Sequence, residues 1–104
     1  MIFMKKGGKA EGEFQKGLIK DLKLIFEGCM ITKNDEQYIQ GIPDLTVFYK
    51  DKYAILECKK SADAPYRPNQ EYYLDIFNKM SFARTVYPEN KNDILEELKK
   101  FFFS

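Results

Sequence analysis

The sequence contains no histidine, and this absence narrows the chemistry that the protein can perform. Without an imidazole there is no Ser-His-Asp or Cys-His nucleophile system, no zinc site built with histidine, and no imidazole general base. Any catalysis by this chain therefore depends on carboxylates, lysines and tyrosines.

Cysteines and long apolar runs are also scarce. Cys29 and Cys58 are too few for a disulfide scaffold and lack the spacing of a metal site. No apolar segment reaches the ~18 residues that a transmembrane helix requires. The first lysines are not followed by the apolar stretch of a signal peptide. We therefore expect a protein without a membrane segment in a reducing cytoplasm.

The net charge of +1 does not by itself indicate a nucleic-acid partner. A DNA-binding chain with this charge must concentrate its lysines locally and place its acids elsewhere, for example on a metal ion. A chain of 104 residues, 44% of them hydrophobic, fits one domain. We expect residues 1–104 to form a single domain in which residues 1–9 are a flexible basic arm.

Hydrophobic periodicity predicts an α/β fold with the element order α-β-β-β-α-β-α and a small mixed sheet flanked by helices. Gly28 is placed to end the first helix. Asn69 is placed to cap the second helix with its side chain, and we expect that helix to bury Met80. The predicted elements are a helix over residues 10–27, strands over 29–33, 45–49 and 53–58, a helix over 70–80, a strand over 83–87 and a helix over 92–102.

Charged residues end the strand that is predicted near residues 53–58. Side chains alternate between the faces of a strand, so Glu57 and Lys59 share one face, and charges in such an apolar setting need partners. If the preceding hairpin turns at residues 51–52, Asp44 lies opposite Lys59 and diagonal to Glu57 on the same face. A four-residue loop keeps this parity, whereas a three-residue loop breaks it.

Two carboxylates beside a lysine suit the hydrolysis of a phosphodiester. Oxygen ligands select Mg²⁺ or Mn²⁺, and such an ion polarises the phosphate and lowers the pKa of bound water. A lysine adds positive charge at the same place. Asp44, Glu57 and Lys59 therefore predict a metal-dependent nuclease.

The run Gly41-Ile42-Pro43-Asp44, followed by Leu56-Glu57-Cys58-Lys59, resembles the signature of the PD-(D/E)XK nuclease superfamily. The fuller pattern resembles its VRR-NUC branch, close to Holliday-junction resolvases, in the stand-alone form found in phages. Gln70 matches a glutamine that opens a helix in that branch. Glu11 matches the acidic residue of its first helix, with Glu13 as the competing choice. The resemblance runs from about Glu11 to Pro88 and implies a restriction-endonuclease-like domain.

The resemblance implies a catalytic set of Glu11, Asp44, Glu57, Lys59 and Gln70. Asp44, Glu57 and the backbone carbonyl of Cys58 would hold Mg²⁺ or Mn²⁺, and Glu11 would bind a second ion or a metal-bound water. Lys59 would position the attacking water. The expected activity is that of an endodeoxyribonuclease selective for branched DNA such as Holliday junctions, acting in the host cytoplasm if the gene belongs to a phage.

Other interpretations of these residues remain open. The charged cluster could be a structural salt-bridge network, and the chain could be a non-catalytic nucleic-acid-binding or protein-binding module with a nuclease-like fold. It could also be a nicking or repair nuclease without junction preference. The amino-terminal lysines could track phosphates or form a solvated face. These lysines are Lys5, Lys6, Lys9, Lys16, Lys20 and Lys23.

Three consecutive phenylalanines, Phe101, Phe102 and Phe103, stand near the carboxyl end. Successive helical residues point ~100° apart, so one core cannot easily hold all three rings. We expect at least one ring to be exposed and to mark the interface of a homodimer. The alternative is that Phe103 packs into a gap on its own domain.

Overall fold

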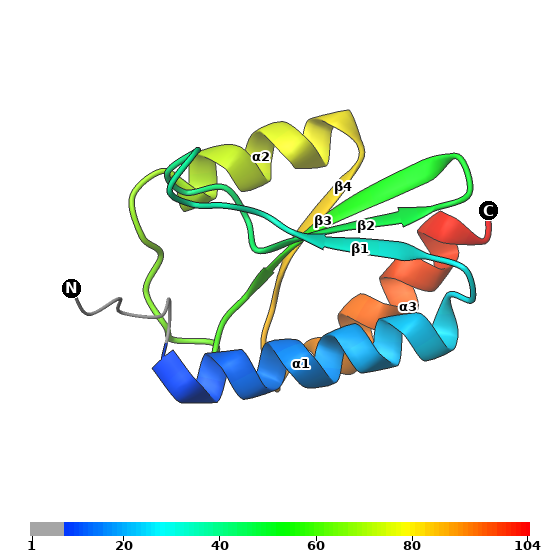
Figure 1. Ribbon diagram of the computed structural model, residues 1–104, viewed down its shortest axis with the longest axis horizontal. Coiled ribbons are helices and arrows are strands. Elements are labelled where there is room, and N and C mark those ends of the chain that lie inside the picture. Colours follow the sequence, from blue (N-terminus) through cyan, green and yellow to red (C-terminus); the bar gives the residue numbers. More distant parts are fainter. Residues whose placement is uncertain (1–7) are drawn as a thin grey trace.

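The computed structural model describes residues 8–104, and its elements follow the predicted order in an α/β fold (Figure 1). Within these residues, no helix combines the length and the apolar character needed to cross a lipid bilayer. The elements are α1 (Gly8–Ile25), β1 (Met30–Lys33), β2 (Leu45–Tyr49), β3 (Lys52–Cys58), α2 (Gln70–Met80), β4 (Phe82–Val86) and α3 (Lys91–Phe102).

The predicted basic arm is wrong for its last two residues, because Gly8 and Lys9 already belong to α1. Glu11 stands in the first turn of this helix, where a carboxylate interacts favourably with the helix dipole. The helix therefore begins earlier than hydrophobic periodicity alone predicts. The remainder of the arm, residues 1–7, lies outside the described residues.

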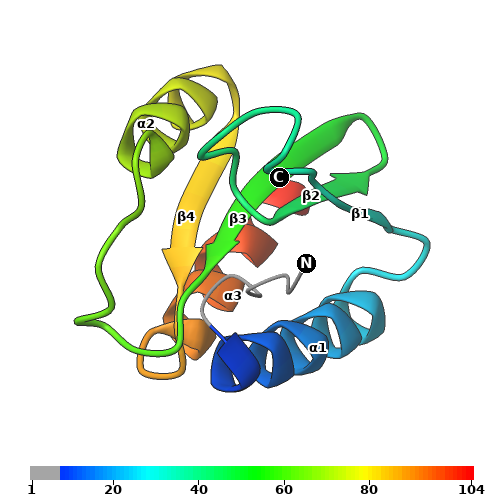
Figure 2. The same ribbon diagram turned by 60° about the vertical axis from the view of Figure 1, so that its left-hand side comes forward.

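The sheet is mixed and has the strand order β1-β2-β3-β4. The pairs β1/β2 and β2/β3 are antiparallel, whereas β3 and β4 run parallel. Parallel neighbours need a crossover connection, and α2 supplies it. Figures 1 and 2 show α2 over one face of the sheet, with α1 and α3 over the other. The sheet therefore separates a face covered by one helix from a face covered by two.

The main core lies between the sheet and the helices α1 and α3. Alternate residues of β2 and β3 point into it, as the two-residue period of a strand requires. Cys58 belongs to this core and is a small buried side chain, as predicted. The core residues are Leu18, Leu22 and Phe26 of α1 and its end, Leu45, Val47, Tyr49, Ala54, Leu56, Cys58, Phe82 and Val86 of the sheet, and Ile94, Leu95, Leu98 and Phe102 of α3.

The face under α2 is less completely buried. Tyr73, Ile76 and Phe77 are half-buried, and the expected burial of Met80 is wrong because its side chain is 65% exposed. Met80 is the last residue of α2, and the chain turns at once through Ser81 into β4. No further turn of this helix covers its side chain.

The β2–β3 hairpin turns at residues 50–51, one residue earlier than predicted. Tyr49 pairs with Lys52 and Leu45 pairs with Leu56, so the register extended by one residue places Asp44 opposite Glu57 rather than opposite Lys59. The two registers differ by an even number of residues, so Asp44 keeps its predicted face.

A contact with α3 explains why Lys52 belongs to the strand rather than to the turn. Its ammonium donates hydrogen bonds of 2.9 Å to the carbonyl oxygens of Phe101 and Ser104, at the carboxyl end of α3. Cations are favoured there by the unpaired carbonyls and the helix dipole. Lys50 takes the turn position instead, with a positive φ of 56°.

The turn before Asp44 depends on a glycine. Gly41 has a φ of 90°, and a Cβ atom added to it would lie 2.6 Å from the carbonyl oxygen of Pro68 and 2.6 Å from the Cβ of Asn69. Only a residue without a side chain allows this turn to pack against the loop that leads into α2. Gly41 thereby fixes the distance between the start of β2 and the start of α2.

We expect Gly41→Ala to lower the free energy of unfolding, by about 1–3 kcal/mol from backbone strain alone and by more from the collision. Gly17→Ala is the matched control, because nothing lies within 4 Å of a Cβ added there. In the interior of α1 that change should stabilise the protein by roughly 0.5–1 kcal/mol. Urea unfolding measures both; equal stability of the two variants would contradict the described packing at Gly41.

Candidate active site

Asp44 and Glu57 lie side by side where the β2–β3 hairpin opens. The backbone N–H of Asp44 donates to Oε1 of Glu57 (3.2 Å), and the backbone N–H of Cys58 donates to Oδ2 of Asp44 (2.8 Å). Each carboxylate is thus held by the strand that carries the other. This reciprocal arrangement fixes both side chains at one end of the sheet.

Glu57 is fully buried, with 0% of its surface exposed. Its Oε2 accepts a hydrogen bond from Nε2 of Gln70 (3.0 Å) and lies 3.6 Å from the ammonium of Lys59. The same ammonium donates to Oε1 of Gln70 (2.8 Å). A buried charge needs such partners because its transfer out of water is costly. The network therefore satisfies a carboxylate and an ammonium in the same small volume.

Gln70 connects this network to the loop before α2. It is the first residue of α2, and its Oε1 also accepts the backbone N–H of Arg67 (2.7 Å). The predicted side-chain cap at Asn69 is wrong: Asn69 has a φ of 71° and makes no side-chain cap hydrogen bond. Gly41 packs closely against Asn69, and Gln70 takes the local hydrogen bond instead.

Lys59 is covered by the aromatic ring of Tyr66, which lies in the loop between β3 and α2. The ammonium lies 5.5 Å from the centre of the Tyr66 ring, within cation–π distance. The hydroxyl of Tyr66 shares a 2.7 Å hydrogen bond with that of Thr85 in β4. Thr85 carries no sequence signal, because only the parallel pairing of β3 with β4 brings it here.

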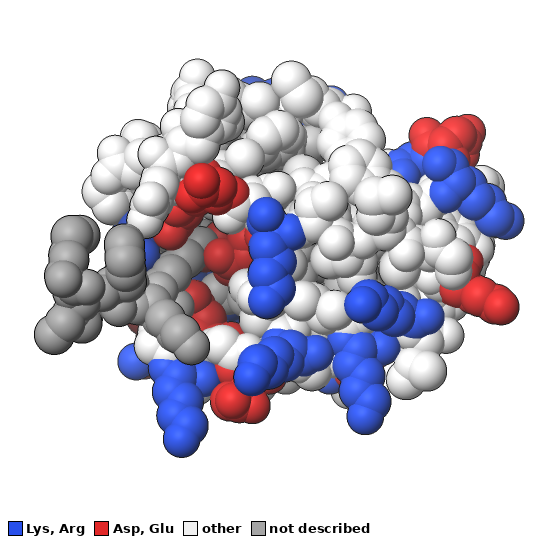
Figure 3. Space-filling model, viewed as in Figure 1, with Lys and Arg blue, Asp and Glu red and all other residues white. Residues whose placement is uncertain are grey.

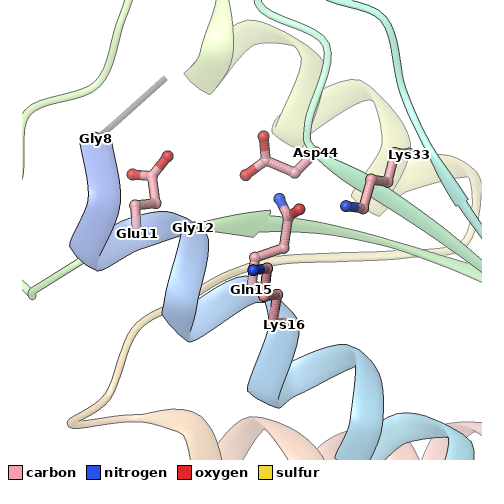
Figure 4. A pocket seen from close by; sticks show the side chains of 7 residues that line it. All are labelled: Gly8, Glu11, Gly12, Gln15, Lys16, Lys33 and Asp44. Carbon is pink, nitrogen blue, oxygen red and sulfur yellow. The ribbon is translucent and has the colours of Figure 1, made fainter. Parts of the chain in front are cut away.

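The first helix directs Glu11, and not Glu13, towards these residues. Glu11 is 4% exposed, whereas Glu13 is exposed and pairs with Lys16 across the surface of α1 (3.8 Å). Figure 4 shows the carboxylates of Glu11 and Asp44 pointing towards one another across a cavity, with Gln15 and Lys33 beside them. The packing of α1 therefore brings Glu11, and not Glu13, beside Asp44.

Two cavities adjoin the carboxylates and share Glu11 as a common wall. The first has a volume of about 280 Å³ and the second of about 210 Å³. Lys33 lines the first cavity, but nothing in the sequence indicated that it belongs to the site. Only its pairing with Leu45 places it next to Asp44. The first cavity is lined by Gly8, Glu11, Gly12, Gln15, Lys16, Lys33 and Asp44.

Basic side chains surround this acidic hollow. Figure 3 shows acidic groups inside the hollow and basic groups spread around it, many of them over α1. The exposed lysines of this helix lie on one side of it, at helical spacing. Lys5 and Lys6 of the predicted basic set lie outside the described residues. The exposed members of that set are Lys9, Lys16, Lys20 and Lys23 of α1; Lys33 of β1, which is outside the predicted set, is exposed as well.

The donor atoms at this place fit a hard divalent cation. Asp44, Glu57 and Glu11 offer carboxylate oxygens, which Mg²⁺ and Mn²⁺ prefer. In a strand the N–H and C=O of one residue point to the same side, so the Cys58 carbonyl faces Asp44 as its N–H does. Among residues 8–104, no three acidic or cysteine side chains are already gathered as a metal cage.

Neither cysteine offers a nucleophile to this site. The thiol of Cys58 points into the core on the face opposite Glu57. Cys29 follows α1, away from the carboxylates, and its partial burial raises the pKa of its thiol, so the thiol form prevails at neutral pH. The chemistry of the site therefore rests on oxygen and nitrogen groups.

No protein-family model, curated protein or solved structure matches this chain. The resemblance to the VRR-NUC branch rests on the sequence motifs alone. What the structure adds is the position of each motif residue.

We expect Glu57→Ala to lower the free energy of unfolding by about 3–5 kcal/mol, because it leaves the buried Lys59 ammonium without its carboxylate. Adding Lys59→Met should recover much of this loss. The matched control is Asp75→Ala, which breaks an exposed 3.0 Å pair with Lys79 and should cost less than ~1 kcal/mol. Urea unfolding compares the three variants; similar losses for Glu57→Ala and Asp75→Ala would mean that the buried network contributes little.

Proposed function

We propose that this chain is a metal-dependent endodeoxyribonuclease that hydrolyses phosphodiester bonds, related to the VRR-NUC branch of the PD-(D/E)XK nucleases. One observation carries the proposal: the adjacent carboxylates of Asp44 and Glu57 share a buried network with the Lys59 ammonium, beside a cavity. Burying such charges is unfavourable for stability, and a binding surface for phosphates has no need of carboxylates. The arrangement is understandable if the carboxylates hold a cation.

The residues that would hold Mg²⁺ or Mn²⁺ are Asp44, Glu57, the Cys58 carbonyl and Glu11. When bound, such an ion polarises the phosphate and lowers the pKa of a bound water. The chain keeps these groups in place through its backbone, because the hydrogen bonds between Asp44, Glu57 and Cys58 link the two strands of the hairpin. Rigid placement of this kind favours a fixed position for the reacting phosphate.

Lys59 would stabilise negative charge on the phosphate and orient the attacking water. Its ammonium is held between Oε1 of Gln70 and the ring of Tyr66, so little motion is needed at the moment of reaction. Gln70 acts as a positioning residue, because it bonds both Lys59 and Glu57. A pre-organised ammonium is more effective than a mobile surface lysine.

The charges around the cavity support a DNA substrate. Lys16 and Lys33 line the first cavity together with the acids, so phosphates can be held beside the carboxylates although the net charge is only +1. The resemblance to Holliday-junction resolvases favours branched DNA over a nicking or repair role without junction preference. We also propose a cytoplasmic location, which suits the two free cysteines.

Cleavage assays test this function directly. Labelled four-way junction, duplex and single-stranded DNA should be cut with Mg²⁺ or Mn²⁺ and left intact with EDTA, with the junction cut fastest. Asp44→Asn, Glu57→Gln and Lys59→Ala should each lower the rate by about 10²-fold or more. Glu11→Gln should also be severe, whereas its neighbour on the exposed side, Glu13→Gln, should act like wild type.

Binding of DNA without cleavage under any of these metals would favour the non-catalytic module. Full activity in EDTA would exclude the metal-dependent mechanism. Equal rates for the Glu11 and Glu13 variants would exclude a catalytic acid on α1.

We further propose that the working unit is a homodimer, since one centre cuts one strand and a junction needs paired cuts. Phe102 is buried and Phe101 is half-buried, whereas Phe103 is 55% exposed although its ring centre lies 5.4 Å from that of Phe26. The carboxyl end of α3 thus leaves an aromatic surface open to a partner.

Light scattering at micromolar concentration should give the mass of two chains, and Phe103→Ser should shift it to one chain. Leu24→Ser is the matched control, because Leu24 is also exposed but lies on α1. A wild-type monomer that still makes symmetric paired cuts would contradict the dimer.

A further inference from the structure

The second cavity shares Glu11 with the first and has a different chemical character. Its volume is about 210 Å³, and it combines basic, aromatic and apolar groups. Most of its wall comes from the loop between β3 and α2, which Figure 2 shows passing beside the first turn of α1. The cavity is lined by Glu11, Lys59, Lys60, Ala64, Pro65, Tyr66 and Arg67.

Tyr66 is held in place at both ends of its side chain. Its hydroxyl is bonded to Thr85 at 2.7 Å, and its ring lies against the Lys59 ammonium at 5.5 Å. The residue nevertheless remains 42% exposed. An anchored and partly open aromatic ring is a surface on which a planar group can stack at little entropic cost.

Arg67 and Lys60 supply positive charge at the same cavity. The backbone N–H of Arg67 donates to Gln70, which ties the loop to the network around Glu57 and Lys59. The Arg67 guanidinium pairs with Glu36 at 3.6 Å through one of its terminal nitrogens. A guanidinium has five N–H donors, so an additional anion can be bound in the same plane. Lys60 is exposed and lines the same cavity.

We propose that this cavity binds one unstacked nucleotide of the cleaved DNA strand, with its base against Tyr66 and Pro65 and its phosphate against Lys60 and Arg67. The inference rests on the proposed nuclease function, because Glu11 borders both this cavity and the one that contains Asp44. An aromatic platform combined with basic groups is the chemistry by which proteins hold single-stranded nucleic acid.

This subsite has a consequence for the substrate. A base inside a continuous duplex is stacked on both sides and cannot offer its face to Tyr66 unless it leaves the helix, which costs a few kcal/mol. Near a branch, a flap or a gap, a nucleotide can already be unstacked, so this cost does not arise. The cavity therefore favours DNA with an unpaired nucleotide next to the cut over an uninterrupted duplex.

Binding to forked DNA in EDTA tests the subsite without requiring cleavage. The probe is a fluorescent forked duplex in which an abasic position replaces one base at a time in the single-stranded arm beside the fork. Tyr66→Ala should weaken binding of the intact fork by about 5-fold to 150-fold, the range of one base–aromatic stack. Tyr72→Ala, at another exposed tyrosine on α2, should bind like wild type.

One abasic position should weaken DNA binding by the wild type by a similar factor. The same position should not change binding by Tyr66→Ala, because the ring on which the base would stack is already missing. Tyr66→Phe keeps the ring but loses the hydrogen bond to Thr85, so it should retain most of the binding that Tyr66→Ala loses. The plot of log K against log salt concentration has a negative slope. Arg67→Ala and Lys60→Ala should each make this slope shallower by about 0.7, as expected for the loss of one phosphate contact. Lys79→Ala on α2 should not change it.

The subsite is overturned if Tyr66→Ala binds the intact fork as tightly as Tyr72→Ala, or if every abasic fork weakens both proteins equally. Cleavage of the same fork by the wild type in Mn²⁺ is measured separately. Tyr66-dependent binding with no cleavage would support the subsite and overturn the nuclease. Cleavage with no Tyr66-dependent binding would support the nuclease and overturn the subsite.

Discussion

Glu57 lies at the end of β3 with its carboxylate withdrawn from solvent, and three parts of the chain contact it. The residue before β2 approaches through the backbone N–H of Asp44, α2 through the amide of Gln70, and the residue after β3 through the ammonium of Lys59. An isolated carboxylate at this depth would be strongly destabilising, so each of these groups has to arrive in a defined position. The hairpin, the crossover helix and the loop between them are thereby tied to one point.

The fold brings these groups together by two features that act at a distance from the chemistry. The parallel pairing of β3 with β4 requires a crossover, so α2 begins beside the end of β3 and places Gln70 there. Gly41 lets the turn before Asp44 pack against the start of that crossover. The apolar core under α1 and α3 stabilises the sheet from its other face, which offsets the unfavourable burial of charge.

Much of the candidate site was already evident in the sequence, but its walls were not. The acid on α1 was narrowed to Glu11 or Glu13, and only the packing of the helix on the sheet turns Glu11 inwards and Glu13 outwards. Lys33 and Thr85 come from strands that carry no recognisable motif. They reach the site because pairing places them beside Asp44 and beside the loop after β3.

The sequence by itself determined the order of the elements and the face on which Asp44, Glu57 and Lys59 lie, because the two-residue period of a strand is a local property. Tertiary structure decided the register. Lys52 belongs to β3, where its ammonium meets the end of α3, and Asn69 has a left-handed backbone where Gly41 packs against it. Both contacts join residues far apart in the chain. Local preferences are encoded in neighbouring residues, whereas these positions depend on which distant surfaces meet when the chain folds.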